Sequence, residues 1–250
     1  MYENTLSVPC DNAYLLDYIS SALADTFRTI DAVTQTAESN GRKYMSYACA
    51  DLYRHVLADK VSDAVADVLS SAYKNKYMRG LLGVSNGSFL QNVLVNVICV
   101  YDSLPDRVVV KKCIDAERPL YLDGYYNFVL APLKRKWSEL SELVGANRYV
   151  LDDETLIVEF LQYLVDSSDE KCGKLSVLFH QDEYFLFDND NALSATLSTL
   201  CKEATAEEEA MVNLVCRRPN KVEIYAKSRP SQEFCALCEA LFMTNYVLAK

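Results

Sequence analysis

The stretch "SSDEKCGK", Ser167 to Lys174, separates two kinds of hydrophobic pattern in this chain of 250 residues. Before it, apolar residues recur every three or four positions, a spacing typical of amphipathic helices. After it come short apolar runs bounded by turns, and one of them alternates between apolar and polar residues, as expected of strands. We therefore expect a helical domain over residues 1–168 and a small α+β domain over residues 169–250, unless the two form one continuous unit.

The helical pattern extends from residue 11 to residue 166. Two stripes show the three-to-four-residue spacing most clearly: Leu15, Ile19, Leu23, Phe27, Ile30 and Val33, then Tyr53, Leu57, Val61, Val65, Val68 and Ala72. Gly41 lies between them in the polar break "ESNGRK" (38–43). The pattern predicts a mainly α-helical N-terminal body.

The C-terminal region is predicted to run strand, strand, helix, strand, helix. "LSVLFH" (175–180) and "YFLFD" (184–188) flank the turn "QDE" and indicate a β-hairpin. The acids of "EATAEEEA" (203–210) suit the start of a helix. "KVEIYA" (221–226) alternates as a third strand, and Ser231 caps a final helix that includes Phe242. The predicted fold class is α+β, with a small sheet that has helices on one face.

Charge and composition limit the compartment and the partners. With 35 acidic and 25 basic residues the net charge is −10, which repels a phosphate backbone unless the basic residues gather on one face. The N-terminus has no basic leader before an apolar run, and no apolar stretch reaches the ~20 residues that span a bilayer. Nine scattered cysteines, an odd number, suit reduced thiols. We expect a soluble, cytoplasmic protein without membrane contact.

The segment "YLDGYYNFVL" (121–130) combines a carboxylate, a glycine, aromatic rings and an amide. In the interpretation that we favour, Asp123 caps a helix that begins at Gly124 and fills the core. The buried face of that helix would then carry its most apolar members: Tyr125, Phe128 and Val129. In the functional alternative, a ligand or a partner is contacted by the remaining members: Asp123, Gly124, Tyr126 and Asn127.

Other candidates for chemistry are few. Cys235 and Cys238, in "CALC", have the spacing of half a zinc site, but zinc needs four ligands and no second pair of this spacing exists. We interpret both thiols as core residues and predict no metal and no cofactor. His55 and His180 belong to unrelated elements, and neither accompanies a catalytic motif. No catalytic residue is predicted, and we expect a protein that is not an enzyme.

Five basic residues bracket the third predicted strand: Arg217, Arg218, Lys221, Lys227 and Arg229. Gathered on one edge of the sheet, they would bind nucleic acid or an acidic partner. The interpretation that we favour is a solvated rim, because cations suit the C-terminal end of the preceding helix.

Parts of the chain resemble the YtxC-like sporulation protein family of endospore-forming Firmicutes. "DGYYNFVL" (123–130) is similar to that family's Gly-aromatic-x-Asn-Phe helix start. "IVEFLQYLVDSSDEK" (157–171) is similar to its Glu-Phe-x-x-x-aromatic-x-Val-Asp segment, and the order of hairpin, helix, "NKVEIY" strand and helix is alike. Where the family pattern has a basic residue after Asn-Phe, this chain has Val129. The resemblance covers roughly the last 130 residues and implies a setting, endospore formation, without a particular activity.

Three function classes are compatible with these observations. The first, which we favour, is a non-enzymatic protein that acts through contacts with an unidentified protein during sporulation; its 17 tyrosines are material for an interface. The alternative is a nucleic-acid-binding module that uses the basic edge. A third hypothesis, an enzyme with a dispersed site, requires a deep cleft with convergent polar groups. A homodimer is compatible with the apolar stripes, although no heptad repeat requires one.

Overall fold

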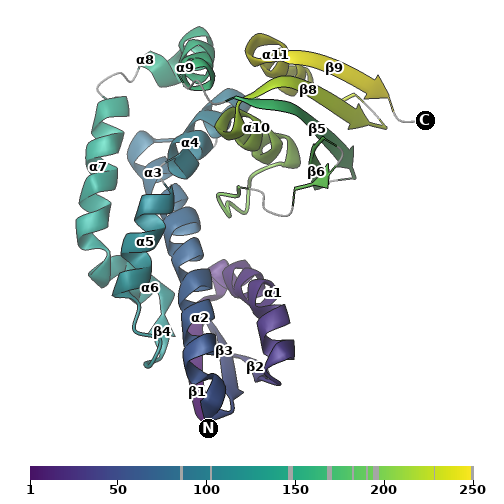
Figure 1. Cartoon of the computed structure of the whole chain (residues 1–250). Coiled ribbons are helices and arrows are strands. Elements are labelled where there is room, and N and C mark those ends of the chain that lie inside the picture. Colours follow the sequence, from purple (N-terminus) through teal and green to yellow (C-terminus); the bar gives the residue numbers. More distant parts are fainter. Residues whose placement is uncertain are drawn as a thin grey trace. The chain divides into compact units, whose positions relative to one another are not determined.

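The computed structural model divides the chain into two compact units (Figure 1). Unit 1 comprises Met1–Lys74 and Ser103–Trp137, and unit 2 comprises Asn75–Asp102 and Ser138–Lys250. The structure describes residues 1–84, 87–101, 103–145, 149–167, 171–181, 183–189, 191–193, 197–227 and 229–248. The domain limit predicted between residues 168 and 169 lies outside the described residues, and the independent folding of the two predicted domains stays a prediction.

A four-stranded sheet forms the base of unit 1. Its strands are β1 (Tyr2–Pro9), β2 (Val33–Ser39), β3 (Arg42–Cys49) and β4 (Leu120–Tyr121), in the order β2-β3-β1-β4. The pairs β2–β3 and β1–β3 are antiparallel, whereas the short β4 pairs with β1 in parallel. One face of the sheet is buried against α1 (Ala13–Thr29), where Leu6, Met45 and Ile19 have at most 1% of their surface exposed.

The prediction of a mainly α-helical N-terminal body is wrong, because this sheet lies in the first half of the chain. Val33, assigned above to a helical stripe, begins β2 after α1 has ended. Asn40 and Gly41 have positive φ angles of 51° and 71°, the conformation of a two-residue type I′ turn. The Asn-Gly pair is a strong hairpin signal, and it outweighs the helical spacing of the residues that precede β2. The chain is mixed α+β, with strands in both halves.

The other helices of unit 1 are short or interrupted. They are α2 (Arg54–Val68), which continues into the π-helical turn η3 (Leu69–Tyr73), then α5 (Ser103–Cys113), α6 (Leu122–Gly124), the π-helical turn η4 (Tyr125–Val129) and the first part of α7 (Ala131–Gly145). Two 3-10 turns, η1 (Cys10–Asn12) and η2 (Asp51–Tyr53), precede α1 and α2. Leu57, Val61 and Val65 are completely buried, so this part of the predicted stripe is confirmed as the core face of α2. Tyr53, the first residue of that stripe, lies in η2 and is 38% exposed, so its predicted burial is wrong.

A buried ion pair lies within unit 1. The ammonium of Lys74 donates to Asp106 Oδ2 at 2.8 Å, and these side chains are 0% and 1% exposed. Trp137 Nε1 donates to the same oxygen at 2.8 Å, and Lys136 Nζ donates to Oδ1 at 3.0 Å. Burial raises the pKa of Asp106, but the hydrogen bonds from the two lysines and Trp137 outweigh it and hold the pKa below its ordinary value.

Unit 2 contains a five-stranded mixed sheet. Its strands are β5 (Cys172–His180), β6 (Glu183–Asp188), β7 (Asn191–Ala192), β8 (Pro219–Ala226) and β9 (Met243–Leu248), in the order β7-β6-β5-β8-β9. β5 and β6 form an antiparallel hairpin, and β7 pairs antiparallel with β6. The neighbours β5, β8 and β9 are parallel, with α11 (Gln232–Leu241) as the connection between β8 and β9.

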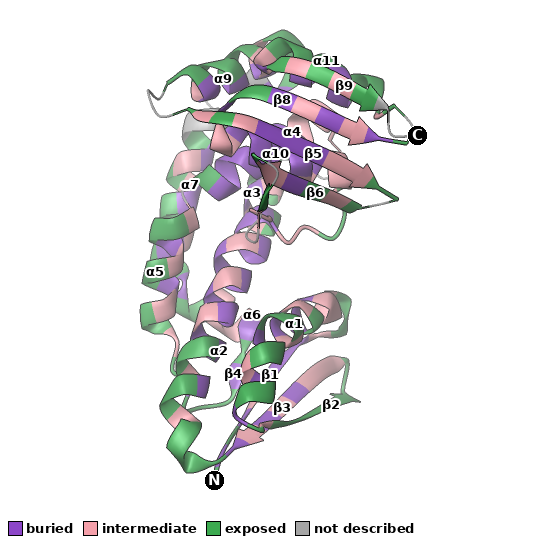
Figure 2. Ribbon diagram, turned by 45° about the vertical axis from the view of Figure 1, so that its right-hand side comes forward, coloured by how far each residue is buried: buried purple, intermediate pink, exposed green. Residues whose placement is uncertain are grey.

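Helices cover one face of this sheet. α10 (Ala206–Arg217) and α11 pack against strands of this sheet (Figure 2). The side that they cover carries Val177 and Ile224, both at most 1% exposed. α4 (Phe89–Tyr101) and α9 (Glu154–Asp166) pack on these two helices, and α3 (Lys74–Leu82) and α8 (Tyr149–Asp152) complete the helices of this part of the chain. A capping box between Thr205 and Glu208 begins α10, where the acidic run predicted a helix start.

The predicted C-terminal order is also corrected. The hairpin, the helix after it and the β8 strand lie where the sequence placed them, but the last element that the structure describes is a strand and not a helix. Ser231 caps α11 as predicted, and the helix ends at Leu241 because Phe242 is extended, with φ −138° and ψ 157°. From Met243 onward the chain pairs with β8, a parallel and non-local contact that local spacing does not reveal.

Candidate functional site

The aromatic segment Tyr121–Leu130 bends through α6 and the π-helical turn η4. Leu122 and Leu130, at its two ends, are at most 1% exposed and anchor it in the core. Leu130 N donates to Tyr125 O at 3.1 Å, the i to i+5 spacing of a π-turn. Between these anchors Asn127 and Val129 are exposed, and Phe128 is 84% exposed. The prediction that Phe128 and Val129 face the core is therefore wrong.

The extra residue of the π-turn explains this outcome. In a regular α-helix that begins at Gly124, Phe128 would lie one turn after Gly124 on the same side. The π-turn inserts one residue before Leu130, so the chain turns the Asn127–Val129 stretch outward while Leu122 and Leu130 stay buried. Single π-turns occur frequently at functional sites, which makes this segment the first candidate for a contact surface.

An ion pair between two elements holds the beginning of the segment. Arg42, the first residue of β3, donates from Nη1 to Asp123 Oδ2 at 3.1 Å and from Nη2 to Asp123 Oδ1 at 2.5 Å. The same guanidinium donates to Ser7 Oγ on β1 at 3.0 Å and lies 5.3 Å from the ring centre of Tyr121. Hydrogen bonds from Arg42 lower the pKa of Asp123, and the carboxylate raises the pKa of Arg42. Asp123 therefore binds its own chain.

A stack of side chains holds the middle of the segment. The ring of Tyr126 lies 4.9 Å from that of Tyr73, centre to centre, and Lys134 Nζ lies 4.6 Å from the centre of the Tyr126 ring. Tyr73 itself is 5% exposed, and its burial raises its pKa. Tyr126 is thereby fixed between a core tyrosine and a cation, an arrangement that favours structure over ligand contact.

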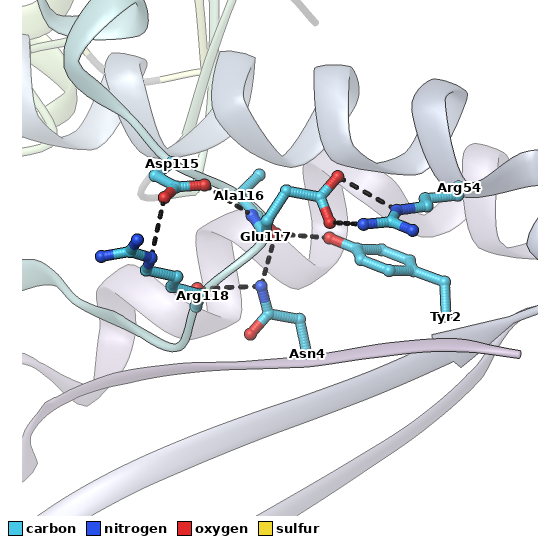
Figure 3. A network of polar contacts seen from close by, with 7 residues as sticks. All are labelled: Tyr2, Asn4, Arg54, Asp115, Ala116, Glu117 and Arg118. Atoms are coloured by element: carbon cyan, nitrogen blue, oxygen red, sulfur yellow. Dashed lines mark hydrogen bonds and ion pairs between the residues drawn. The ribbon is translucent and has the colours of Figure 1, made fainter.

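The loop that precedes the segment is fastened to β1 (Figure 3). Asn4 Nδ2 donates to the carbonyl oxygens of Ala116 at 2.5 Å and Arg118 at 2.9 Å, and Tyr2 Oη donates to Ala116 O at 2.5 Å. Both side chains come from the buried face of β1. The backbone between α5 and β4 is therefore a fixed support for the aromatic segment.

The same loop also contacts helix α2 and the aromatic segment. Glu117 in the loop forms an ion pair with Arg54 of α2 (Figure 3). Asp115 N donates to Tyr125 Oη at 3.1 Å. Of the predicted contact residues, the structure thus gives Asp123 and Tyr126 internal partners, places Gly124 half-buried between them, and leaves Asn127 exposed beside Phe128. The sequence identified the segment but not the direction in which its rings point.

The five basic residues of the C-terminal region do not gather at one point. Arg217 and Arg218 end α10 and precede β8, and Lys221 is the third residue of that strand. Lys227 and Arg229 follow the other end of β8, so the strand separates the two groups by roughly 25–30 Å.

Two of these cations are already engaged within unit 2. Lys221 Nζ pairs with Glu223 at 2.9 Å, and Arg218 Nη2 donates to Tyr101 Oη at 3.0 Å. This arrangement fits a solvated rim, because both cations already contact a side chain of this chain, Glu223 for Lys221 and Tyr101 for Arg218. Binding of nucleic acid through this edge stays a prediction.

The cysteine pair lies inside α11. Cys235 and Cys238 are 3% and 0% exposed, and burial raises the pKa of the Cys238 thiol, which disfavours the thiolate that metal binding or redox exchange needs. Within the described ranges, no group of three or more His, Cys, Asp or Glu side chains is arranged to hold a metal ion.

An apolar row on the sheet of unit 2 was missed by the sequence reasoning. The register aligns four side chains across β6, β5, β8 and β9: Phe185, Leu178, Tyr225 and Val247. They lie on the face opposite to α10 and α11, and Phe185 is 44% exposed. The available signal was that apolar residues occupy both the inward and the outward positions of the hairpin strands, as in "VLF" (177–179).

Comparisons with protein families, with curated proteins and with solved structures give no match. Among the residues that the structure describes, no helix combines the length and the apolar character needed to cross a membrane. The geometry of the chain itself must therefore support any proposal about its role.

Proposed function

We propose that this is a non-enzymatic cytoplasmic protein that acts through protein–protein contacts, and that the Asn127–Val129 stretch is the contact point. One observation carries the proposal: Phe128 is 84% exposed although it lies in a helical turn that is anchored on both sides. The same stretch contains Asn127 and Phe128, which belong to one of the two segments that carry the resemblance to the YtxC-like sporulation family. We therefore propose endospore formation as the setting.

The exposed ring has an energetic consequence for binding. Moving a phenylalanine side chain from water into an apolar pocket contributes about 1.5–3 kcal/mol. Aromatic side chains of this kind form the centres of many interfaces, where a few residues provide most of the affinity. A partner with an apolar pocket and polar groups for the amide of Asn127 fits this surface.

The support beneath the ring matters as much as its exposure. Binding costs roughly 0.5–1.5 kcal/mol for each flexible side chain that must be ordered. Here the backbone that carries Phe128 is already fixed on its N-terminal side by two contacts. These are the ion pair of Arg42 with Asp123 and the stack of Tyr126 on Tyr73. The segment is therefore preorganised for contact.

Affinity capture from sporulating cells, with the full chain as bait, tests the proposal. A protein recovered by the wild type is purified, and its dissociation constant is measured for the wild type and for Phe128→Ala. We expect the variant to weaken binding about ten- to a hundredfold, from the loss of one buried ring. Asp123→Asn should have a smaller effect, because it loosens the support and leaves the ring in place.

Phe185→Ala is the matched control, since Phe185 is also an exposed phenylalanine but lies on the sheet of unit 2. It should bind the partner like the wild type. Equal affinities of Phe128→Ala and the wild type would contradict the proposal, as would a loss of binding that Phe185→Ala reproduces.

A further inference from the structure

β2 is an exposed strand at the edge of the unit 1 sheet. It is the outermost strand of the unit 1 sheet, and all seven of its residues, Val33–Ser39, are exposed (Figure 2). Its register with β3 is continuous from Val33 to Ser39, so no bulge interrupts the strand. Exposed and regular strand edges present unpaired backbone groups that pair readily with another chain.

The turn that joins β2 to β3 defines which backbone groups are free. Ser39 pairs with Arg42 directly across the two-residue turn, and in such hairpins this flanking pair exchanges both of its hydrogen bonds. Because hydrogen-bonded pairs alternate along antiparallel strands, the N–H and C=O groups of Thr34, Thr36 and Glu38 point to the free edge.

The opposite edge of the same sheet is protected. β4 pairs with Leu6 and Ser7 of β1. The loop that precedes β4 accepts hydrogen bonds from Asn4 and Tyr2 (Figure 3). β2 contains no proline and no lysine, two residues that commonly protect strand edges. Its single charged residue, Glu38, faces Lys43 across the β3 pair.

We propose that β2 pairs with β2 of a second copy of this chain, antiparallel and centred on Thr36, to join two four-stranded sheets into one. In this register Thr36 lies opposite Thr36 of the second copy, and Thr34 lies opposite Glu38. The free backbone groups of Thr34, Thr36 and Glu38 then bond one another across the two-fold axis.

The sequence of β2 is complementary to itself in this register. No charge faces a like charge, because each Glu38 lies opposite a threonine, and the central threonine pair is a favourable cross-strand pair. The strand is also rich in residues with high strand propensity, with two threonines and a valine in seven positions. These features select a second copy as the occupant of the edge.

Two charge variants test the position of the axis. Thr36→Lys and Thr36→Glu each place like charges opposite one another in the homodimer, so the dimer dissociation constant from sedimentation equilibrium should rise at least about tenfold. An equimolar mixture of the two variants should dimerise again, because the lysine introduced in one chain then faces the glutamate introduced in the other.

Val33→Lys is the control for the added charge, as it also replaces an exposed β-branched residue of β2 by lysine. The two introduced lysines would be about 20 Å apart in the dimer, six residues along the strands, so its dissociation constant should stay within about threefold of the wild type. Amide exchange gives a second readout: Thr36 N–H should become protected as the concentration of the wild type rises, and Gln35 N–H should be protected at every concentration.

Three results would overturn the proposal: a wild type that stays monomeric up to roughly 100 µM, a mixture of the two charge variants that stays monomeric, or a Val33→Lys variant as weak as Thr36→Lys. An unchanged dimer dissociation constant in Thr36→Lys would also overturn it, because the interface would then lie elsewhere, for example on the edge strand β9.

Discussion

Replacement of Asp106 by asparagine should strongly destabilise unit 1. The change keeps the size of the side chain and removes the charge that faces Lys74, whose ammonium is completely buried. A buried cation without its partner retains its desolvation penalty, and such single replacements cost about 3–5 kcal/mol. The pair Arg28–Asp25 is the comparison: its side chains are 78% and 91% exposed, so Asp25→Asn should cost about 0.5 kcal/mol or less.

Trp137 provides the assay. It is the only tryptophan of the chain, it is completely buried, and it donates to Asp106, so its fluorescence reports unfolding of unit 1. For a urea dependence of about 2 kcal/mol per molar, a loss of about 4 kcal/mol lowers the midpoint by roughly 2 M. Only midpoints and slopes are compared, because the substitution also changes the surroundings of the indole.

A second substitution tests the cause. Adding Lys74→Met to Asp106→Asn removes the stranded ammonium, so the double variant should be more stable than Asp106→Asn alone. If Asp106→Asn alone does not fold, folding of the double variant with Lys74→Met gives the same test. The reasoning would be refuted if Asp106→Asn cost no more than Asp25→Asn, or if Lys74→Met destabilised the Asp106→Asn protein further.

Three further predictions concern local features. Gly41→Ala places a Cβ at φ 71° with no atom within 4 Å, so only backbone strain opposes it, and urea unfolding should show a loss of about 1–2 kcal/mol. Thr205→Ala removes the α10 cap and should cost about 0.5–2 kcal/mol in the same assay, whereas Thr205→Ser should restore most of it. Hydrogen bonds from Lys221, Lys174 and Tyr225 lower the pKa of Glu223 to about 2, so its NMR titration should lie below that of ordinary glutamates and return upward in Lys221→Ala. The stability that this contact provides should be present above pH ~4.3 and decline as the pH falls toward about 2. A Glu223 titration near the ordinary value, or a fully stable Gly41→Ala or Thr205→Ala protein, would contradict the respective prediction.

The elements that sequence predicted correctly are those whose signals are local. The α2 stripe from Leu57 to Val65 and the capped start of α10 follow from spacing and capping within about a dozen residues. The β5–β6 hairpin follows from two short apolar runs around a short turn. Each of these features is stabilised by neighbours in the chain, so the pattern and the fold agree.

The errors have physical reasons that can be named. The hairpin of β2 and β3 was missed although Asn40–Gly41 marks it, because the residues of β2 are exposed and therefore carry no apolar alternation. β9 was missed because its pairing partner β8 lies about twenty residues earlier and is reached only through a helix. For the candidate site, the segment was identified and Asn127 was among its candidate residues, but Phe128 was assigned to the core and lies exposed in a π-turn.

Local sequence determined where turns, caps and amphipathic faces occur, because those depend on the preferences of adjacent residues. Tertiary structure alone decided which strands pair and that Arg42 contacts Asp123, 81 residues away in the sequence. It also decided that the side chain of Phe128 is exposed to solvent. These outcomes depend on burial and on distant partners. A residue's own neighbours in the chain do not specify them, since the free energy of each contact is realised only when the whole sheet and its helices have assembled.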